Sequence, residues 1–281
     1  MKLNKNSCLL TASILLCGCS AAIPLHKADD RINALAYGMA DYCFNPEKKS
    51  TDITSTLILW KELLDEIYKG GMEPDSDTGR YNYMDTGLEL TPYPEDADVA
   101  GATVGVPLQA TLAQFTESLL WPDWLEVFTD PLRYYVYERE YTVGDREEFL
   151  AGNENYLETY NYQEDVGQSG ISFAYYTTMT FERILPSQNP SLPEEGVLIV
   201  CNMMDGEAQR VAGGYNAYMT DLYSFNIYYP ISESVTYRIN GTWLRAGGSL
   251  WIFGAGANSG NVGEGILDEI ESLMNWITSH Y

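Results

Sequence analysis

Carboxylates and histidines are the side chains that decide which chemistry this sequence can support. The 281-residue chain holds 40 Asp and Glu residues but only two histidines, His26 and His280. Each histidine is near one end of the sequence, where we expect exposed, mobile segments. A Ser-His-Asp or Cys-His mechanism needs an imidazole held against its nucleophile, and zinc sites usually combine several His or Cys ligands. The histidine count therefore disfavours both classes of enzyme.

Glycoside hydrolysis tolerates a shortage of histidine, because two carboxylates about 5 Å or about 6.5–9.5 Å apart can suffice. Tyr and Trp residues are also available for stacking on sugar rings. No pattern in the sequence pairs two carboxylates in space, so a carboxylate-dependent hydrolase acting on glycans stays the alternative hypothesis. The candidate carboxylates, which lie in or beside predicted strands, are Glu138, Glu140, Glu182 and Asp205.

An acidic segment contains two motifs, Asp77-Thr78-Gly79 and Asp85-Thr86-Gly87, that match the core triplet of aspartic proteases. In that family each triplet follows an apolar strand and the two copies come from separate lobes. Here the copies are too close together and follow no strand, so we interpret them as acidic turns. The same segment could supply oxygen ligands to a weak calcium site, although its spacing differs from the EF-hand loop. A solvated turn is the alternative to this calcium site, whose ligands would be Asp75, Asp77, Asp85 and Glu89. No other cofactor is expected.

The glycines from Gly254 to Gly265 superficially match a phosphate-cradling turn. A dinucleotide-binding fold needs further βα units after such a turn, and here only one predicted helix follows. We predict a surface loop at these glycines.

The N-terminus has the pattern of an export signal. Lys2 and Lys5 precede an apolar run, residues 8–16, that is shorter than the roughly 20 residues needed to span a bilayer. The sequence Leu16-Cys17-Gly18-Cys19 follows, and it resembles the lipobox of bacterial lipoproteins. The resemblance implies cleavage before Cys19, acylation of Cys19 and a lasting membrane anchor. An ordinary secretory signal is the alternative. Because Ser20 is not Asp, the resemblance also implies the outer membrane as location.

The remaining cysteines, Cys43 and Cys201, form an even pair in a chain predicted to reach an oxidising compartment. We predict that they form a disulfide, with two separately buried thiols as the alternative.

Charge and tyrosine content restrict the partners. Without Lys2 and Lys5, 14 basic residues face 40 acidic ones, which gives a formal charge of −26. This charge excludes nucleic acid and suits a basic protein partner, although solubility alone can explain it. A glycan is the other candidate partner, because tyrosines suit contact surfaces, while cross-strand aromatic pairing is their structural explanation. The tyrosines concerned are Tyr134, Tyr135, Tyr137, Tyr141, Tyr175, Tyr176, Tyr228, Tyr229 and Tyr237.

Hydrophobic periodicity predicts the elements that position these residues. Apolar stripes predict helices over 28–42 and 51–69, a third helix through Leu108 to Leu119, and a terminal amphipathic helix through Ile266 to Ile277. Alternating or continuous apolar runs predict strands over 133–143, 171–185, 197–204 and 248–253. Asn240-Gly241, between two apolar runs, predicts a hairpin turn.

The predicted fold class is therefore α+β, with N-terminal helices, an antiparallel β-sheet in the second half and a closing helix. The expected organisation is a signal peptide over 1–18, a lipidated tether over 19–27 and one domain over 28–281 with an acidic loop over 73–105. The hypothesis for function is a membrane-anchored envelope lipoprotein that binds or supports another component without catalysis.

Overall fold

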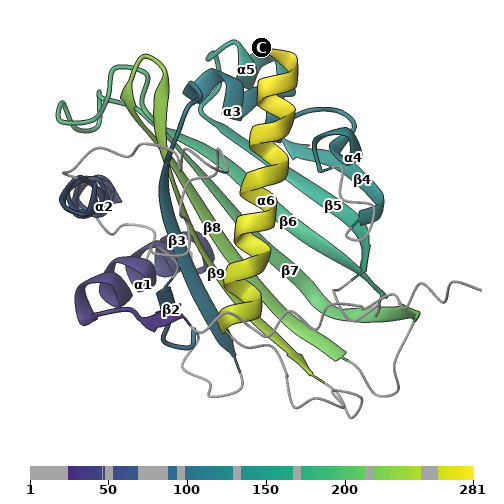
Figure 1. Ribbon diagram of the computed structural model, residues 1–281. Coiled ribbons are helices and arrows are strands. Elements are labelled where there is room, and N and C mark those ends of the chain that lie inside the picture. Colours follow the sequence, from purple (N-terminus) through teal and green to yellow (C-terminus); the bar gives the residue numbers. More distant parts are fainter. Residues whose placement is uncertain are drawn as a thin grey trace, which may run out of the picture.

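The computed structural model describes residues 25–45, 47, 53–68, 88–93, 99–128, 134–166, 172–212, 218–247 and 259–281. Its main feature is a broad β-sheet crossed on one face by a long C-terminal helix (Figure 1). The predicted α+β class, with helices first, a largely antiparallel sheet and a closing helix, is confirmed.

The sheet has nine strands in the order β1-β2-β3-β9-β8-β7-β6-β5-β4. Strands β4 to β9 form an antiparallel meander, β3 joins it through β9, and β1 pairs with β2 in parallel. The strands are β1 (His26–Lys27), β2 (Leu88–Leu90), β3 (Ala100–Leu108), β4 (Tyr134–Val143), β5 (Tyr156–Val166), β6 (Ser172–Ile184), β7 (Val197–Ala212), β8 (Tyr218–Ser232) and β9 (Val235–Gly247).

Helices cover both faces of the sheet, and each face has its own hydrophobic core. On one face, apolar residues of β3, β6 and β7 pack against α3, α4, α5 and α6. On the other face, buried apolar residues of α1 and α2 pack against β7, β8 and β9. Figure 1 shows α6 in front of the sheet and α1 behind β3. The helices are α1 (Asp30–Phe44), α2 (Ile53–Ile67), α3 (Leu112–Leu119), α4 (Trp124–Val127), α5 (Arg146–Leu150) and α6 (Ser259–His280).

A disulfide links α1 to the sheet. The structure joins Cys43, near the end of α1, to Cys201 on β7, with the Cα atoms 5.5 Å apart. These are the two cysteines predicted to pair. At its other end α1 is capped by Asp29, whose carboxylate accepts a hydrogen bond of 2.8 Å from the Ile32 amide. Both ends of α1 are thus fixed.

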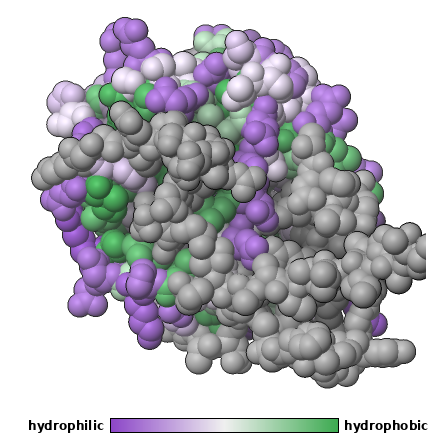
Figure 2. All heavy atoms as spheres, in the orientation of Figure 1, coloured by the Kyte–Doolittle hydropathy of each residue, from purple (hydrophilic) through white to green (hydrophobic). Residues whose placement is uncertain are grey.

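The helices of the described ranges contain no segment long and apolar enough to cross a membrane. In the view of Figure 2, hydrophilic side chains lie along the upper edge of the molecule.

The predicted hairpin at Asn240-Gly241 is wrong. The chain turns from β8 into β9 at Glu233-Ser234 instead, and Asn240-Gly241 lies inside β9 between β3 and β8. Packing explains the glycine, because a Cβ atom at Gly241 would lie 2.4 Å from Cε1 of Phe225. Asn240 is buried, and its Nδ2 donates to Asn226 Oδ1 over 2.8 Å. Tertiary packing therefore accounts for a dipeptide that the sequence analysis assigned to turn chemistry.

The acidic segment 73–105 was predicted as a loop, but it contains β2 and most of β3. Leu108, predicted in a helix, ends β3. The glycines of β3 accommodate neighbouring side chains: a Cβ atom at Gly101 would lie 2.5 Å from Trp243 Cδ1, and one at Gly105 would lie 2.8 Å from Leu64 Cδ2. These glycines allow close packing between elements and do not form a turn. Residues 69–87 and 94–98 of this region lie outside the described residues.

The two ends of the described chain also differ from expectation. His26 and Lys27, at the end of the predicted tether, pair with β2, and Leu25 lies against Gly263 of α6. His280 belongs to the last turn of α6, where its ring stacks on Trp276 with centroids 4.0 Å apart. Both histidine side chains are exposed, but each histidine belongs to a regular element, His26 to β1 and His280 to α6.

The glycines from 260 to 265 lie in α6 rather than in the predicted loop. Residues 248–258, including the predicted strand 248–253, lie outside the described residues.

Candidate functional site

Buried polar side chains gather on the face of the sheet that α6 covers. Burying such groups costs free energy unless they are hydrogen-bonded, so a cluster of them inside a hydrophobic core suggests a role beyond packing. Strand register places them on this face, since they alternate with the residues that contact α1 and α2. The buried members are Thr159, Asn161, Gln163, Thr177, Ser224, Asn226, Arg238 and Asn240.

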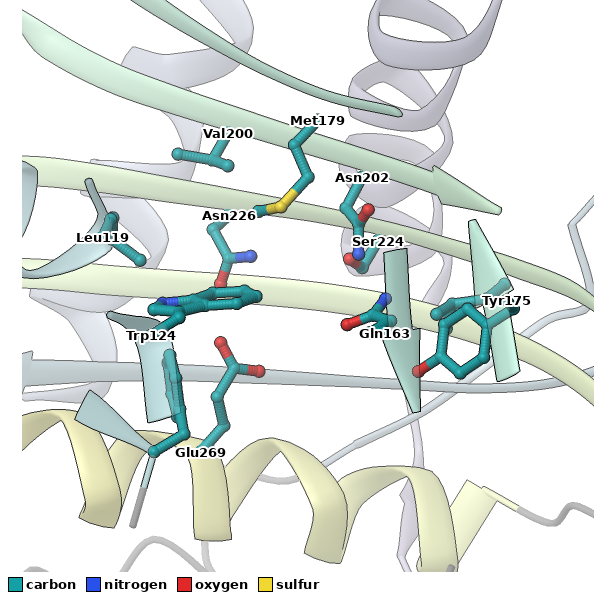
Figure 3. A pocket seen from close by; sticks show the side chains of 12 residues that line it. Leu119, Trp124, Gln163, Tyr175, Met179, Val200, Asn202, Ser224, Asn226 and Glu269 are labelled. Atoms are coloured by element: carbon teal, nitrogen blue, oxygen red, sulfur yellow. The ribbon is translucent and has the colours of Figure 1, made fainter. Parts of the chain in front are cut away.

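A cavity of about 60 Å³ lies among these side chains, between the sheet and α6 (Figure 3). About 10–15 Å³ of such volume accommodates one water molecule, so the cavity has room for a few waters or one small molecule. Polar groups line it from several elements: Gln163 of β5, Asn202 of β7, Ser224 and Asn226 of β8, and Glu269 of α6. The apolar lining consists of Leu119, Trp124, Phe128, Tyr175, Met179, Val200 and Leu222.

The sheet register brings the polar lining residues together. Asn202 pairs with Ser224 across β7 and β8, and Asn226 is two residues further along β8 on the same face. Figure 3 shows Glu269 extending from α6 toward the sheet, on the side where Trp124 and Asn226 also line the cavity. Side chains far apart in the sequence therefore converge on one cavity.

An ion pair borders the cavity. The guanidinium of Arg238, which is fully buried, donates from Nη2 to Glu269 Oε1 over 2.8 Å. Its Nε and Nη2 also donate to Asn226 Oδ1 over 3.2 and 2.9 Å. Because the charges of Arg238 and Glu269 compensate each other, the cavity is close to electrically neutral. Asn202 Oδ1 is buried and has no hydrogen-bond partner among the described residues.

A second polar network supports the Trp124 wall. Tyr137 donates from its hydroxyl to Asn161 Oδ1 over 2.8 Å. Arg139 lies with its guanidinium carbon 5.2 Å from the centre of the Trp124 ring and donates to the Leu119 carbonyl over 2.9 Å. Burial raises the pKa of the Tyr137 hydroxyl to about 12. The network holds a neutral phenol and a cation beside the aromatic wall.

The candidate carboxylates lie on the opposite face of the sheet, away from the cavity. One cross-strand row reads Glu138, Tyr162, Tyr176, Asp205. Its two carboxylate residues are three strand spacings apart, about 14 Å between backbones, with two tyrosines between them. Glu140 lies two residues from Glu138 on the outermost strand, β4, and is exposed like it. The cavity described above is lined by none of these residues.

Glu182 is separate from the other three candidates. It lies opposite Tyr156 on β5 and Ile199 on β7, and its carboxylate contributes to raising the pKa of Tyr42 in α1, after burial as the main cause. Glu182 therefore belongs to the packing between α1 and the sheet.

The calcium candidates Asp75, Asp77 and Asp85, and both Asp-Thr-Gly motifs, lie outside the described residues, while Glu89 belongs to β2. Across the described parts of the chain, no group of three or more His, Cys, Asp or Glu side chains could hold a metal ion.

The predicted tyrosines divide between the two faces. Tyr175 and Tyr228 face α6, whereas Tyr229 and Tyr237 are buried in the core with α1 and α2. Tyr176 is exposed and stacks on Tyr160 across β5 and β6, with ring centroids 5.2 Å apart. The side chains of Tyr134 and Tyr135 lie outside the description.

Sequence reasoning missed the cavity residues for a definable reason. In β8 and β9, Ser224, Asn226, Arg238 and Asn240 alternate with apolar residues, which is the pattern of a strand with one solvated face. Here the apolar side packs on α1 and α2, and α6 covers the polar side as well. The polar residues of β8 and β9 line a cavity instead of an exposed surface only because α6 covers them, and the local sequence pattern does not contain that information.

No family model and no curated protein sequence matches this chain. Among solved structures, the human StarD13 lipid transfer and protein localization domain aligns at 13% identity and a TM-score of 0.43, covering 78% of this chain and 96% of that one. A START superfamily protein from Mycobacterium smegmatis aligns at 9% identity and a TM-score of 0.38, covering 64% and 99%. Norcoclaurine synthase from Thalictrum flavum aligns at 10% identity and a TM-score of 0.34, covering 65% and 88%. Likeness at this level assigns no function to the chain.

Proposed function

We propose that this chain is an exported protein anchored by a lipid on Cys19 that binds a small uncharged polar molecule, without catalysis, in the cavity beneath α6. The observation that carries the binding proposal is the convergence of Gln163, Asn202, Ser224 and Asn226 on one buried cavity.

Energetics favour a ligand over a purely structural role. A polar group buried without a partner costs about 1–3 kcal/mol, so a core built only for stability would use apolar residues at these positions. Asn202 Oδ1 is buried with no partner among the described residues, which leaves an acceptor available for a ligand donor. A bound molecule or a few waters would satisfy it.

The lining also defines the ligand chemistry. Amide side chains offer both donors and acceptors, and Trp124 gives one flat apolar wall. Arg238 already compensates the charge of Glu269. An additional charge inside the cavity would be desolvated without a counter-ion, so the preferred ligand is neutral and bears hydroxyl or amide groups.

The same lining supports binding without catalysis. Ser224 is the one hydroxyl-bearing aliphatic residue of the lining, which contains no histidine. Glu269 is engaged by Arg238. A serine nucleophile needs a base within hydrogen-bond reach, and in the described parts of the chain no side chain that could act as a base is hydrogen-bonded to Ser224.

The anchoring part of the proposal rests on the sequence, from the basic start to Cys19. Leu25 packs on Gly263 at the start of α6. Leu25 is six positions after Cys19 in the sequence, a span of at most about 20 Å. The anchor would therefore hold the β1–β2 edge and the N-terminal end of α6 toward the membrane.

The anchor is tested by the intact mass of the membrane-extracted protein, beside a Cys19→Ala variant. We expect the mass of residues 19–281 plus a diacylated or triacylated cysteine, and accumulation of precursor in the variant. An unlipidated wild-type protein refutes the anchor but leaves the cavity proposal standing.

Ligand binding is tested by ligand-observed NMR on the mature protein with acetamide and acetate, which have nearly the same shape but differ in charge. We expect acetamide to bind measurably and acetate to bind at least tenfold more weakly. Ser224→Leu, which fills the cavity, should abolish the acetamide signal. Thr178→Leu, on the other face of the sheet, is the matched control and should keep it. Equal binding of both probes, or an acetamide signal that survives in Ser224→Leu, refutes the proposal.

A further inference from the structure

An acidic tyrosine face lies on the side of β4–β7 opposite the cavity. Strand register defines it as two adjacent rows, Glu138-Tyr162-Tyr176-Asp205 and Glu140-Tyr160-Thr178-Met203. Of the described helices, α1 and α2 pack on this side of the sheet, and their core involves β7, β8 and β9 rather than these rows. Tyr176 is 45% exposed and Met203 is 37% exposed.

The rings of this face form an ordered aromatic group. The centroids of Tyr160 and Tyr176 are 5.2 Å apart with nearly parallel planes, 11° between them. Tyr162 and Tyr176 are 5.1 Å apart. Each flanking tyrosine is fixed by a carboxylate: Tyr160 donates to Asp205 Oδ2 over 3.0 Å, and Tyr162 donates to Glu164 Oε1 over 2.5 Å. The side chains are thus positioned before any partner arrives.

The chemistry of this face suits cations. The two rows contain three carboxylate residues and no Lys or Arg. The hydrogen bond to Glu164 raises the pKa of Tyr162 to about 12, so its ring stays a neutral phenol at physiological pH. A tyrosine ring face attracts Lys or Arg side chains, and neighbouring carboxylates add ion pairs. The formal charge of −24 for the whole chain attracts the same partners over a longer range.

We propose that the acidic tyrosine face docks a Lys- and Arg-rich segment of a partner protein, which places a cationic side chain against Tyr176. This interaction is separate from ligand binding in the cavity, because the two sites lie on opposite faces of the sheet. Charge complementarity favours the basic segment over a neutral glycan, which could donate hydrogen bonds to the carboxylates but would form no ion pairs with them.

The test measures fluorescence anisotropy of a labelled dodecapeptide of alternating lysine and serine with the mature protein in detergent. Tyr176→Ala removes the central ring without changing charge. Tyr281→Ala is the matched control, because Tyr281 is 60% exposed and also donates to a carboxylate, that of Glu117, but lies at the end of α6. We expect Tyr176→Ala to weaken binding about threefold to tenfold and Tyr281→Ala less than twofold.

Further outcomes separate the alternatives. A Glu138→Gln, Asp205→Asn double variant should weaken binding, and added salt should weaken it further. Ser224→Leu should leave peptide affinity unchanged, so failure of the cavity proposal does not affect this one. Equal losses in Tyr176→Ala and Tyr281→Ala would mean diffuse attraction and overturn the proposal. Binding of maltohexaose that depends on Tyr176, without binding of the peptide, would overturn it in favour of a glycan. Melting curves of each variant confirm that it is folded.

Discussion

Removal of the disulfide between Cys43 and Cys201 should lower the free energy of unfolding by several kcal/mol. The two cysteines are 158 residues apart in the sequence. In the chain-entropy model, closing a loop of this length in the unfolded chain corresponds to about 5 kcal/mol at 25 °C, and measured losses are typically about 2–5 kcal/mol. We therefore expect a Cys43→Ala, Cys201→Ala double variant to lose about 2–5 kcal/mol.

The loss should be measured by urea unfolding followed by tryptophan fluorescence. The unfolded variant is less compact than the cross-linked chain, so the dependence of unfolding free energy on urea should also steepen. Reduced wild-type protein is the matched control and should approach the variant. Before reduction, the unfolded mature wild type should contain no free thiol, and after reduction it should contain two.

Hydrogen exchange shows which elements lose stability when the disulfide is removed. Because the disulfide joins α1 to β7, amides of α1 should exchange faster in the variant, while amides of α6 should change only through the global loss of stability. A loss below about 1 kcal/mol with an unchanged urea dependence would refute the reasoning. Two free thiols in the unreduced wild type would refute the pairing itself.

Further predictions concern glycine packing and alkaline stability. Gly241→Ala should destabilise the protein by about 1–3 kcal/mol in urea unfolding, because its Cβ would lie 2.4 Å from Phe225. Gly38→Ala, inside α1, is the control and should be neutral or stabilising by up to about 1 kcal/mol, since its Cβ would lie 3.8 Å from Thr56 of α2, an ordinary contact distance. Burial raises the pKa of Tyr228 to about 12, so the folded state holds this proton more tightly than the unfolded state. Its contribution to stability is complete below pH of about 10 and is lost as pH rises toward about 12, by at most about 3 kcal/mol. Tyr228→Phe should therefore raise the pH of the alkaline unfolding transition. It should cost little stability at pH 7, because the buried Tyr228 hydroxyl has no hydrogen-bond partner among the described residues. An unchanged alkaline transition in this variant would contradict the raised pKa of Tyr228.

The fold class followed from hydrophobic periodicity where helices were amphipathic and strands were long. The stripe of Ile266 to Ile277 predicted α6, and the apolar run from Val197 predicted β7. Periodicity failed where small residues serve close packing. Gly101, Gly105 and Gly241 looked like turn or loop residues, but each makes room for a large side chain from another element. Such contacts join distant parts of the chain, so no local window contains them.

The candidate sites were predictable to different degrees. The tyrosine-rich strands were visible in the composition, which left a contact surface and cross-strand aromatic pairing as alternatives. The cavity was not visible, since Asn226 and Arg238 read as ordinary residues of a solvated strand face. Their burial depends on α6, which begins more than 20 residues after Arg238. The hydrogen bond between Arg238 and Glu269 forms only when α6 packs on the sheet, so neither segment alone predicts it.

If the proposed anchor holds the protein at Cys19, the disulfide between α1 and β7 has a mechanical consequence. A pull on the anchor reaches the domain first through β1, which pairs with β2 over only His26 and Lys27, so that this edge would separate at low force. Unravelling could then continue through α1 but would stop at Cys43, where a covalent bond carries the load to Cys201. The tether could lengthen by at most about 60 Å before the disulfide carries the load.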